Sequence, residues 1–402
     1  MIRKLLRRPT APVHSALVKS AAAAGWLVCA ASVAVYVYGA VRLPYSPDEM
    51  SDLHVYLGAV HTMIAGGSLY QFVSFNGDGF NYPPFAGMAF VPLAPWPEPA
   101  PRVFWTLLQC AEAVILAGMI LARSDHPALN WVPRAAALPA LTCLLLVSQP
   151  VFWGLFLGQV SLLITVLALL DALDLTPKRL RGIPAGLAAA IKLTPLLFVP
   201  YLWITGRRPT ATVALATFMF CTGFAWLALP TDSVTYWSSH LSPPGFVNLA
   251  QWDNESFRGL LARLHWAGGG STLVLAALTV IVTVLGYVRS QRAYRNGLVL
   301  PGAVIIGATT VLVSPISWNH HQTLLVLAAA CVISGTSKWA NIAWSTAVYL
   351  LMTLPFQGFL DRRWPAGHLL TDDAVLCLAL LITCGIPFKP WQGTPGGRSS
   401  KA

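Results

Sequence analysis

Charged residues are scarce in this chain. They make up 10% of its 402 residues, whereas a soluble domain has about 25%, and 56% of the chain is hydrophobic. Acidic residues are the fewest, with 15 Asp and Glu against 26 Lys and Arg. This composition excludes an ordinary soluble domain and predicts an all-α protein that crosses a membrane several times.

Metal-binding motifs and a continuous basic surface are also missing. The 7 cysteines lie in apolar segments without CxxC spacing or a nearby His, so they indicate small core residues and no zinc site. The net charge of +11 comes from short basic clusters between apolar runs, not from one basic helix face. The clusters therefore predict membrane orientation and no nucleic-acid partner.

Long apolar runs dominate what is present. Taken as spans of about 15 to 20 residues, they predict about 11 to 12 transmembrane helices, counting a broken pair over 183–205. The other centres fall near Val33, Val114, Leu144, Val166, Phe218, Leu278, Ile306, Leu327, Val348 and Leu380. The first run, 21–40, resembles a signal peptide, but no small-residue cleavage site follows it, so we expect a retained helix.

The basic clusters orient the spans. Most Lys and Arg fall in cytoplasmic loops if the N-terminus is inside, as the positive-inside rule requires. The long loops 42–101 and 230–270 then lie outside and carry membrane-parallel helices, and we expect function there. We predict one domain over 1–388, a disordered cytoplasmic tail over 389–402, and a multi-pass protein of the plasma membrane with an extracytoplasmic active site.

The segment GIPAGLAAAIKLTPLLFVPYLWIT lies between two basic clusters and is too short for two full spans. It predicts a hairpin of two short helices, spanning or re-entrant, broken between Lys192 and Pro195. Lys192 is a lone cation at membrane depth. Such residues are costly and usually face a polar cavity or a partner, and a phosphate would suit this ammonium.

The first long loop places Asp52 before a helix with apolar residues at Leu53, Tyr56, Leu57, Val60 and Ile64. Asp52 is either an N-cap or a carboxylate at the rim of an outward cavity, and both roles are compatible. Tyr82 precedes two prolines that forbid a helix, which gives a stiff extended segment near the membrane. Tyr82 could anchor at the interface or contact substrate.

Two further polar stretches are candidates. NESFRGLLARL contains Asn254, Glu255 and Arg258, either as a solvated helix start or as substrate ligands. SPISWNHH places Trp318, Asn319, His320 and His321 at the outer boundary of a span. An interfacial His is often structural, yet an imidazole can also donate a hydrogen bond to a lipid phosphate. Adjacent His residues on a helix point about 100° apart, so only one can face a given ligand.

Together the segments DLHVYLGAV, GGSLY, FNYPPF, LGQVSLL, AIKLTP, NESFRGLLARL and SPISWNHH resemble, in order, the motifs of the GT-C glycosyltransferases of family 87, in the pattern of its actinobacterial mannosyltransferases. The resemblance runs from about Asp52 to Gln322 and implies a GT-C fold. It implies an enzyme that moves mannose from polyprenyl-phosphate-mannose to a phosphatidylinositol mannoside or related lipoglycan through an α-1,2 bond. It matches Asp52 to the catalytic aspartate and His320 or His321 to a donor-phosphate ligand.

A β-linked donor and an α product require one in-line displacement with inversion. Asp52 would take the acceptor proton, while Lys192, His320 or His321, and Arg258 would neutralise the leaving phosphate without a metal or cofactor. No DxD pair is present, although Asp48 and Asp52 could still meet an ion. Alternatives are another polyprenyl-phosphate-sugar transferase, such as one that branches lipomannan or transfers arabinose, and a secondary transporter with a discontinuous helix at Lys192.

Overall fold

The computed structural model describes residues 15–42, 49–241, 247–266, 268–333, 335–354 and 373–389. Its elements are helices, and in these ranges the only β pairing consists of two isolated bridges, Val73 with Gly79 and Ile333 with Phe388. The predicted all-α class is confirmed. The predicted tail over 389–402 lies outside the described residues beyond Lys389, and so does Asp48.

Four described helices are long and apolar enough to cross a membrane. They are α2 (Ser15–Val41), α5 (Ala100–Arg123), α11 (Arg208–Ala228) and α14 (Gly269–Arg295). A fifth span is possible if α6 (Arg134–Val147) and α7 (Gln149–Leu157), which meet at 67°, are taken together. The extended backbone of Ser148 and the proline that follows Gln149 break this pair.

The remaining apolar helices are shorter than a bilayer requires. Among them are α8 (Ser161–Ala172), α15 (Val299–Val313), α17 (Lys338–Leu351), α16 (Thr323–Val326) with η9 (Leu327–Ala330), and α19 (Ala374–Leu380) with η10 (Leu381–Gly385). Every predicted span centre falls in a described helix, but the described part of the chain does not contain 11 or 12 full-length spans. Polar and proline-rich breaks interrupt the apolar runs, and such backbone is tolerated where protein surrounds it or a cavity adjoins it.

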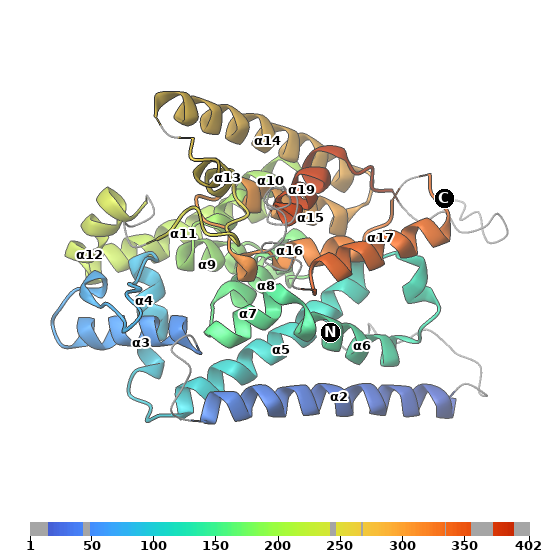
Figure 1. Cartoon of the computed structure of the whole chain (residues 1–402), viewed down its shortest axis with the longest axis horizontal. Coiled ribbons are helices and arrows are strands. Elements are labelled where there is room, and N and C mark those ends of the chain that lie inside the picture. Colours follow the sequence, from blue (N-terminus) through green and yellow to red (C-terminus); the bar gives the residue numbers. More distant parts are fainter. Residues whose placement is uncertain are drawn as a thin grey trace.

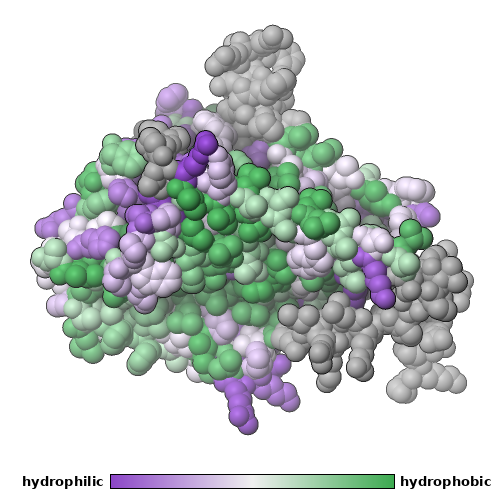
Figure 2. All heavy atoms as spheres, turned by 90° about the horizontal axis from the view of Figure 1, so that it is seen from below, coloured by the Kyte–Doolittle hydropathy of each residue, from purple (hydrophilic) through white to green (hydrophobic). Residues whose placement is uncertain are grey.

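Two long helices form apolar outer surfaces. α2 and α14 run along opposite sides of the molecule, at the bottom and top of Figure 1. Leu273 and Val280 of α14 are 74% and 62% exposed, and Leu17 of α2 is 73% exposed. Figure 2, which views the side of α2, shows apolar side chains over much of that face. A helix that is hydrophobic on its exposed side fits contact with lipid.

The predicted hairpin at Lys192 is confirmed. α9 (Ile183–Ile191) ends at Lys192, whose backbone is extended, and η6 (Thr194–Leu197) and α10 (Phe198–Ile204) return the chain. Both ends meet at Asp171: its carboxylate accepts hydrogen bonds from the Gly182 and Ala185 N–H groups. Its backbone carbonyl accepts one from Arg207. The hairpin therefore begins and ends on the same side, and Lys192 lies at its far end.

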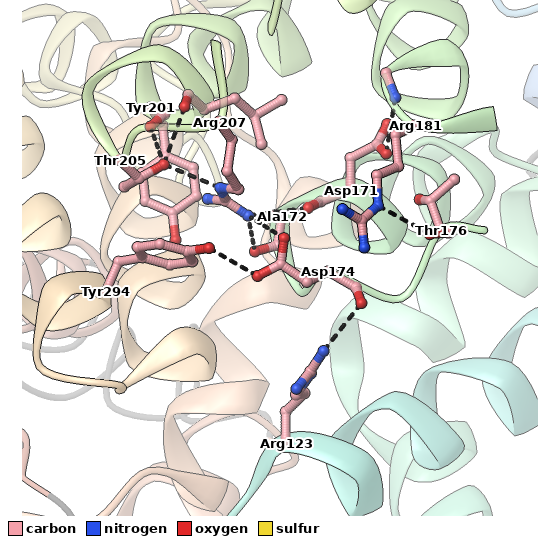
Figure 3. A network of polar contacts seen from close by, with 12 residues as sticks. Arg123, Asp171, Ala172, Asp174, Thr176, Arg181, Tyr201, Thr205, Arg207 and Tyr294 are labelled. Atoms are coloured by element: carbon pink, nitrogen blue, oxygen red, sulfur yellow. Dashed lines mark hydrogen bonds and ion pairs between the residues drawn. The ribbon is translucent and has the colours of Figure 1, made fainter. Parts of the chain in front are cut away.

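A polar network fixes that shared side of the hairpin (Figure 3). The Arg207 guanidinium lies over the Tyr201 and Tyr294 rings, 4.9 Å and 4.1 Å from their centroids. It also donates to the Ala172 carbonyl at 2.8 Å and pairs with Asp174 at 3.3 Å. Tyr294 donates a hydrogen bond to Asp174 as well. These contacts join the segments that the charge pattern assigns to cytoplasmic loops.

At one end of the molecule, on the left of Figure 1, lie α3 (Ser51–Ile64), α4 (Pro84–Phe90) and α12 (Pro230–Thr235). The 3₁₀ turns η2 (Leu69–Gln71) and η3 (Val91–Leu93) flank α4 in sequence, and the π-helical turn η7 (Tyr236–His240) continues α12. Elsewhere the chain forms η4 (Pro127–Asn130), η5 (Lys178–Leu180), α13 (Phe257–Arg263) and η8 (Asn319–His321). These short elements position the polar candidates.

Candidate active site

Asp52 lies in the first turn of α3 and does not cap the helix. The N-cap is Met50, which has a left-handed backbone (φ 56°) and forms no side-chain cap, so the predicted N-cap role of Asp52 is wrong. The Met50 N–H donates to the Phe156 carbonyl at 2.8 Å and ties the start of α3 to α7. The Asp52 carboxylate is therefore not used in capping the helix, and it lines a cavity.

This cavity, which we call the Asp52 cavity, has a volume of about 350 Å³. Segments far apart in sequence contribute to it: α3, the loop 76–82, the end of α7, the loop 247–253 and the loop that carries Trp318. The residues used below are Asp52, Asp78, Asn81, Tyr82, Gln159, Trp153, Trp252, Asp253, Trp318, Asn319 and His320. The two long loops and the SPISWNHH segment thus meet in one place, as the sequence predicted.

Gln159 is a hydrogen-bonding centre beneath Asp52. Its Oε1 accepts from the Tyr56 hydroxyl at 3.0 Å and from the Tyr82 hydroxyl at 3.1 Å. Its side chain is also a hydrogen-bond partner of the Asp52 carboxylate. Gln159 follows Gly158, whose left-handed backbone (φ 71°) lets the turn between α7 and α8 approach Leu53 closely. Gln159 was not predicted as a site residue, although an amide inside the apolar run LGQVSLL was a usable signal.

Lys192 and His321 form a second polar pair. The Lys192 Nζ lies 2.6 Å from the His321 Nε2 and donates to the Tyr82 hydroxyl at 3.4 Å. Both residues line a cavity of about 240 Å³ that also contains Leu193, Leu241 and Ile316, and we call this the Lys192 cavity. A smaller space of about 40 Å³ adjoins the same pair on the side of Thr165 and Thr310. Within the described residues, Lys192 has no carboxylate within salt-bridge distance.

The two adjacent histidines belong to different cavities. His320 lines the Asp52 cavity, whereas His321 lines the Lys192 cavity, and their rings lie 4.2 Å apart at 78°. This agrees with the prediction that only one of them can face a given ligand. The two cavities share the lining residues Asn81, Tyr82 and Trp318. A molecule that occupies this border would lie next to polar residues of both the Asp52 cavity and the Lys192 cavity.

The NESFRGLLARL residues lie elsewhere. Asn254 and Glu255 are fully buried, and both hold Ser317: Asn254 accepts from its N–H, and the Glu255 N–H donates to its carbonyl. Ser256 caps α13 by accepting from the Gly259 N–H. Arg258 lines none of the three described cavities. Asn254 and Glu255 thus position the loop next to Trp318, and the structure does not bring Arg258 to Lys192.

The pKa of the Asp52 carboxyl is shifted toward neutral pH. Its pKa is raised from 3.8 to about 7 as the net effect of four causes: burial, the largest, raises it, the hydrogen bond from Gln159 lowers it, the negative charge of Asp78 raises it and the Lys192 charge lowers it. A carboxylate with such a pKa is suited to accept a proton near neutral pH. No group of three metal-ligating side chains is found in the described ranges.

Comparisons with known proteins indicate the family of the chain. The chain is 30% identical to the polyprenol-phosphate-mannose-dependent α-(1-2)-phosphatidylinositol pentamannoside mannosyltransferase of Mycolicibacterium smegmatis, over 68% of this chain and 67% of the relative. It is 28% identical to the protein of that name from Mycobacterium tuberculosis, over 76% and 72%. It is 27% identical to a phosphatidylinositol mannoside mannosyltransferase of the same species, over 72% and 69%.

No solved structure matches the chain significantly. The profile of glycosyltransferase family 87 matches residues 80–315, which include Tyr82, Gln159 and Lys192. With the family profile and the curated relatives in agreement over most of its length, the chain belongs to glycosyltransferase family 87 and is a membrane-bound mannosyltransferase.

Proposed function

We propose that this enzyme transfers mannose from polyprenyl-phosphate-mannose to a phosphatidylinositol mannoside, forming an α-1,2 bond with inversion. The relatives' names supply the donor, the acceptor and the linkage. The observation that carries the proposal is the pair of adjoining cavities, with Asp52 in one, Lys192 and His321 in the other, and Tyr82 at their border. An in-line displacement needs a base and a cation on opposite sides of the reacting carbon.

Asp52 is the proposed general base. An acceptor hydroxyl in the Asp52 cavity attacks the anomeric carbon, and the carboxylate takes its proton as the new C–O bond forms. The hydrogen bond from Gln159 orients the carboxylate, and Tyr56 and Tyr82 hold Gln159 in turn. The anomeric carbon would lie near Tyr82 and Trp318, where the cavities meet.

Lys192 and His321 are the proposed ligands of the leaving phosphate. As the C–O bond to phosphate breaks, negative charge develops on the phosphate oxygens, and fixed cations and N–H donors stabilise it. The absence of a carboxylate salt bridge to Lys192 in the described residues supports an anionic ligand there. We infer that no metal ion is needed, so a chelator should leave transfer unchanged.

The donor also accounts for the position of the site. The Lys192 cavity combines the Lys192 and His321 side chains with apolar walls at Leu193, Leu241 and Ile316, which suit a phosphate attached to a hydrocarbon chain. We infer a site at the extracytoplasmic side of the plasma membrane, in line with the charge pattern of the loops. A discontinuous helix at Lys192 also occurs in transporters, but membership of a glycosyltransferase family favours catalysis.

The test is transfer by purified enzyme from labelled polyprenyl-phosphate-mannose to defined phosphatidylinositol mannosides, with linkage analysis of the product. We expect Asp52→Asn to lower kcat by about 100-fold to 10,000-fold, the usual range for loss of a general base. Lys192→Met should lower kcat by about 100-fold or more, because one transition-state donor is lost. Asp125→Asn is the matched control, since Asp125 is an exposed carboxylate outside the cavities.

Full transfer by Asp52→Asn would refute the assignment of the base. Transfer of arabinose in place of mannose, or a linkage other than α-1,2, would refute the proposed reaction and favour the related transferases. Uptake of a solute into vesicles without sugar transfer would favour a transporter.

A further inference from the structure

The Asp52 cavity is acidic and aromatic, which its role as a base site does not require. Asp78 and Asp253 line it together with Asp52, and none of its described lining residues is Lys or Arg. Trp153, Trp252 and Trp318 add three indole rings. Carboxylates accept hydrogen bonds from hydroxyls, and an indole offers a flat apolar face with one N–H donor. These groups together suit an uncharged polyhydroxylated ligand.

Three buried polar atoms of residues that line this cavity lack partners in the described structure, and one of them is the Nε1 of Trp318. His320 is 3% exposed, and its Nε2 has no hydrogen-bond partner. The Oδ1 of Asp253 is buried and unpartnered as well. A buried polar atom without a partner destabilises the fold, so native proteins rarely retain one without a reason. His320 and Asp253 come from separate loops, and a ligand with several hydroxyls would satisfy both.

The two cavities differ in the charge of their lining residues. The Lys192 cavity contains an ammonium and an imidazole, whereas the Asp52 cavity contains three carboxylates. A phosphate in the Asp52 cavity would face these carboxylates, and no Lys or Arg lines that cavity, so the juxtaposition is unfavourable. The anionic part of each substrate is therefore directed away from Asp52.

We propose that the Asp52 cavity recognises the acceptor through its uncharged terminal sugars alone, with Asp253 and His320 as specificity-determining ligands of sugar hydroxyls. The inference rests on the proposed function and names the part of the acceptor that enters. The phosphoinositol of a lipid acceptor then lies outside the cavity and makes no required contact with it. A neutral oligomannoside on an alkyl chain should serve as an acceptor.

The first experiment compares three acceptors with the wild-type enzyme and labelled polyprenyl-phosphate-mannose. They are a phosphatidylinositol mannoside, an alkyl α-oligomannoside with the same terminal sugars, and that alkyl glycoside with a phosphate on its terminal mannose, away from the reacting hydroxyl. We expect kcat/KM for the neutral glycoside within about tenfold of that for the lipid, and at least about 100-fold lower for the phosphorylated one.

The second experiment uses Asp253→Asn, which keeps the size of the side chain and removes its charge. The acceptor KM should rise about tenfold or more, because a charge-assisted hydrogen bond is weakened, while the donor KM stays constant. Discrimination against the phosphorylated glycoside should also decrease, an effect that a merely structural role would not produce. Asp125→Asn should alter none of these values.

The outcomes separate this inference from the proposed function. If no acceptor receives mannose, the proposed function fails. If the phosphatidylinositol mannoside is a substrate and the neutral glycoside is not, the function stands and this inference is refuted. An unchanged acceptor KM in Asp253→Asn would also refute the assigned role of Asp253.

Discussion

At the scale of single residues, Asp52 shows how the surroundings of a side chain set its pKa. Burial raises the pKa of its carboxyl most, Asp78 raises it further, Gln159 and Lys192 lower it, and the resulting value is about 7. A base must be deprotonated to act, so deprotonation of Asp52 should give kcat/KM a limb that rises with pH through this value. Below it the carboxyl is protonated and cannot take the acceptor proton.

Removing the negative charge of Asp78 should shift the pH dependence of transfer. In Asp78→Asn the repulsion between two carboxylates disappears, so the pKa of Asp52 decreases and the rising limb of kcat/KM shifts to lower pH. The measurement is a pH series of transfer at low acceptor concentration. Asp253→Asn is the matched control, because Asp253 lines the same cavity and is not among the groups that shift the pKa of Asp52. A limb that stays in place in Asp78→Asn would contradict the electrostatic account.

The sequence predicted Asp52, Lys192 and the histidine pair because each is a polar residue with a visible anomaly in an apolar context. It did not predict the role of Gln159, which depends on a turn that brings α7 and α8 against α3. It also could not assign His320 and His321 to separate cavities, since that depends on the local turn and the packing around it. For Asn254 the sequence left a helix start and a substrate ligand as alternatives, and it did not predict the hydrogen bond from the Ser317 N–H to Asn254 that holds a loop.

At the scale of elements, α9 determines where Lys192 lies. Asp171 fixes the start of the helix, and Lys192 follows its last residue. Along its length α9 packs closely on α11: a Cβ built on Gly186 would lie 2.4 Å from the Ala214 carbonyl oxygen. The hairpin was predictable from Pro195 and the flanking basic clusters. The close approach was not, because α11 becomes a neighbour only in the fold.

Gly186→Ala should therefore destabilise the enzyme and impair it. The added methyl group collides with backbone, so α9 must shift, at a cost of about 1–3 kcal/mol. A displaced Lys192 would also lower kcat, since small misplacements of a catalytic group are costly. Thermal unfolding in detergent and transfer assays measure both effects. Gly223→Ala in α11 is the control, because a Cβ there meets no atom within 4 Å. Equal stability of the two variants would contradict this packing argument.

At the scale of the whole molecule, the chain has two polar ends with different roles. One end holds the two cavities, and the other holds the network around Arg207 and Asp174 (Figure 3). The positive-inside rule grouped these loops correctly because loops on one side of a membrane can meet in the fold. The length of the apolar runs predicted 11 to 12 spans, more full-length spans than the described residues contain, because runs such as 323–330 form short helices surrounded by protein.

This two-ended arrangement predicts sidedness. Ser238 in η7 lies near the Lys192 cavity, and Arg179 in η5 lies in the loop before the hairpin; both are exposed. We expect a membrane-impermeant maleimide to label Ser238→Cys in intact cells and Arg179→Cys only after the membrane is opened. The unmodified chain gives the baseline, because its cysteines lie in apolar segments. Because η7 contributes Tyr236 and His240 to the Lys192 cavity, labelling of Ser238→Cys reports the side of the membrane on which that cavity binds the donor phosphate. Labelling of Arg179→Cys from outside would invert the topology, and the proposed extracytoplasmic site would fail with it.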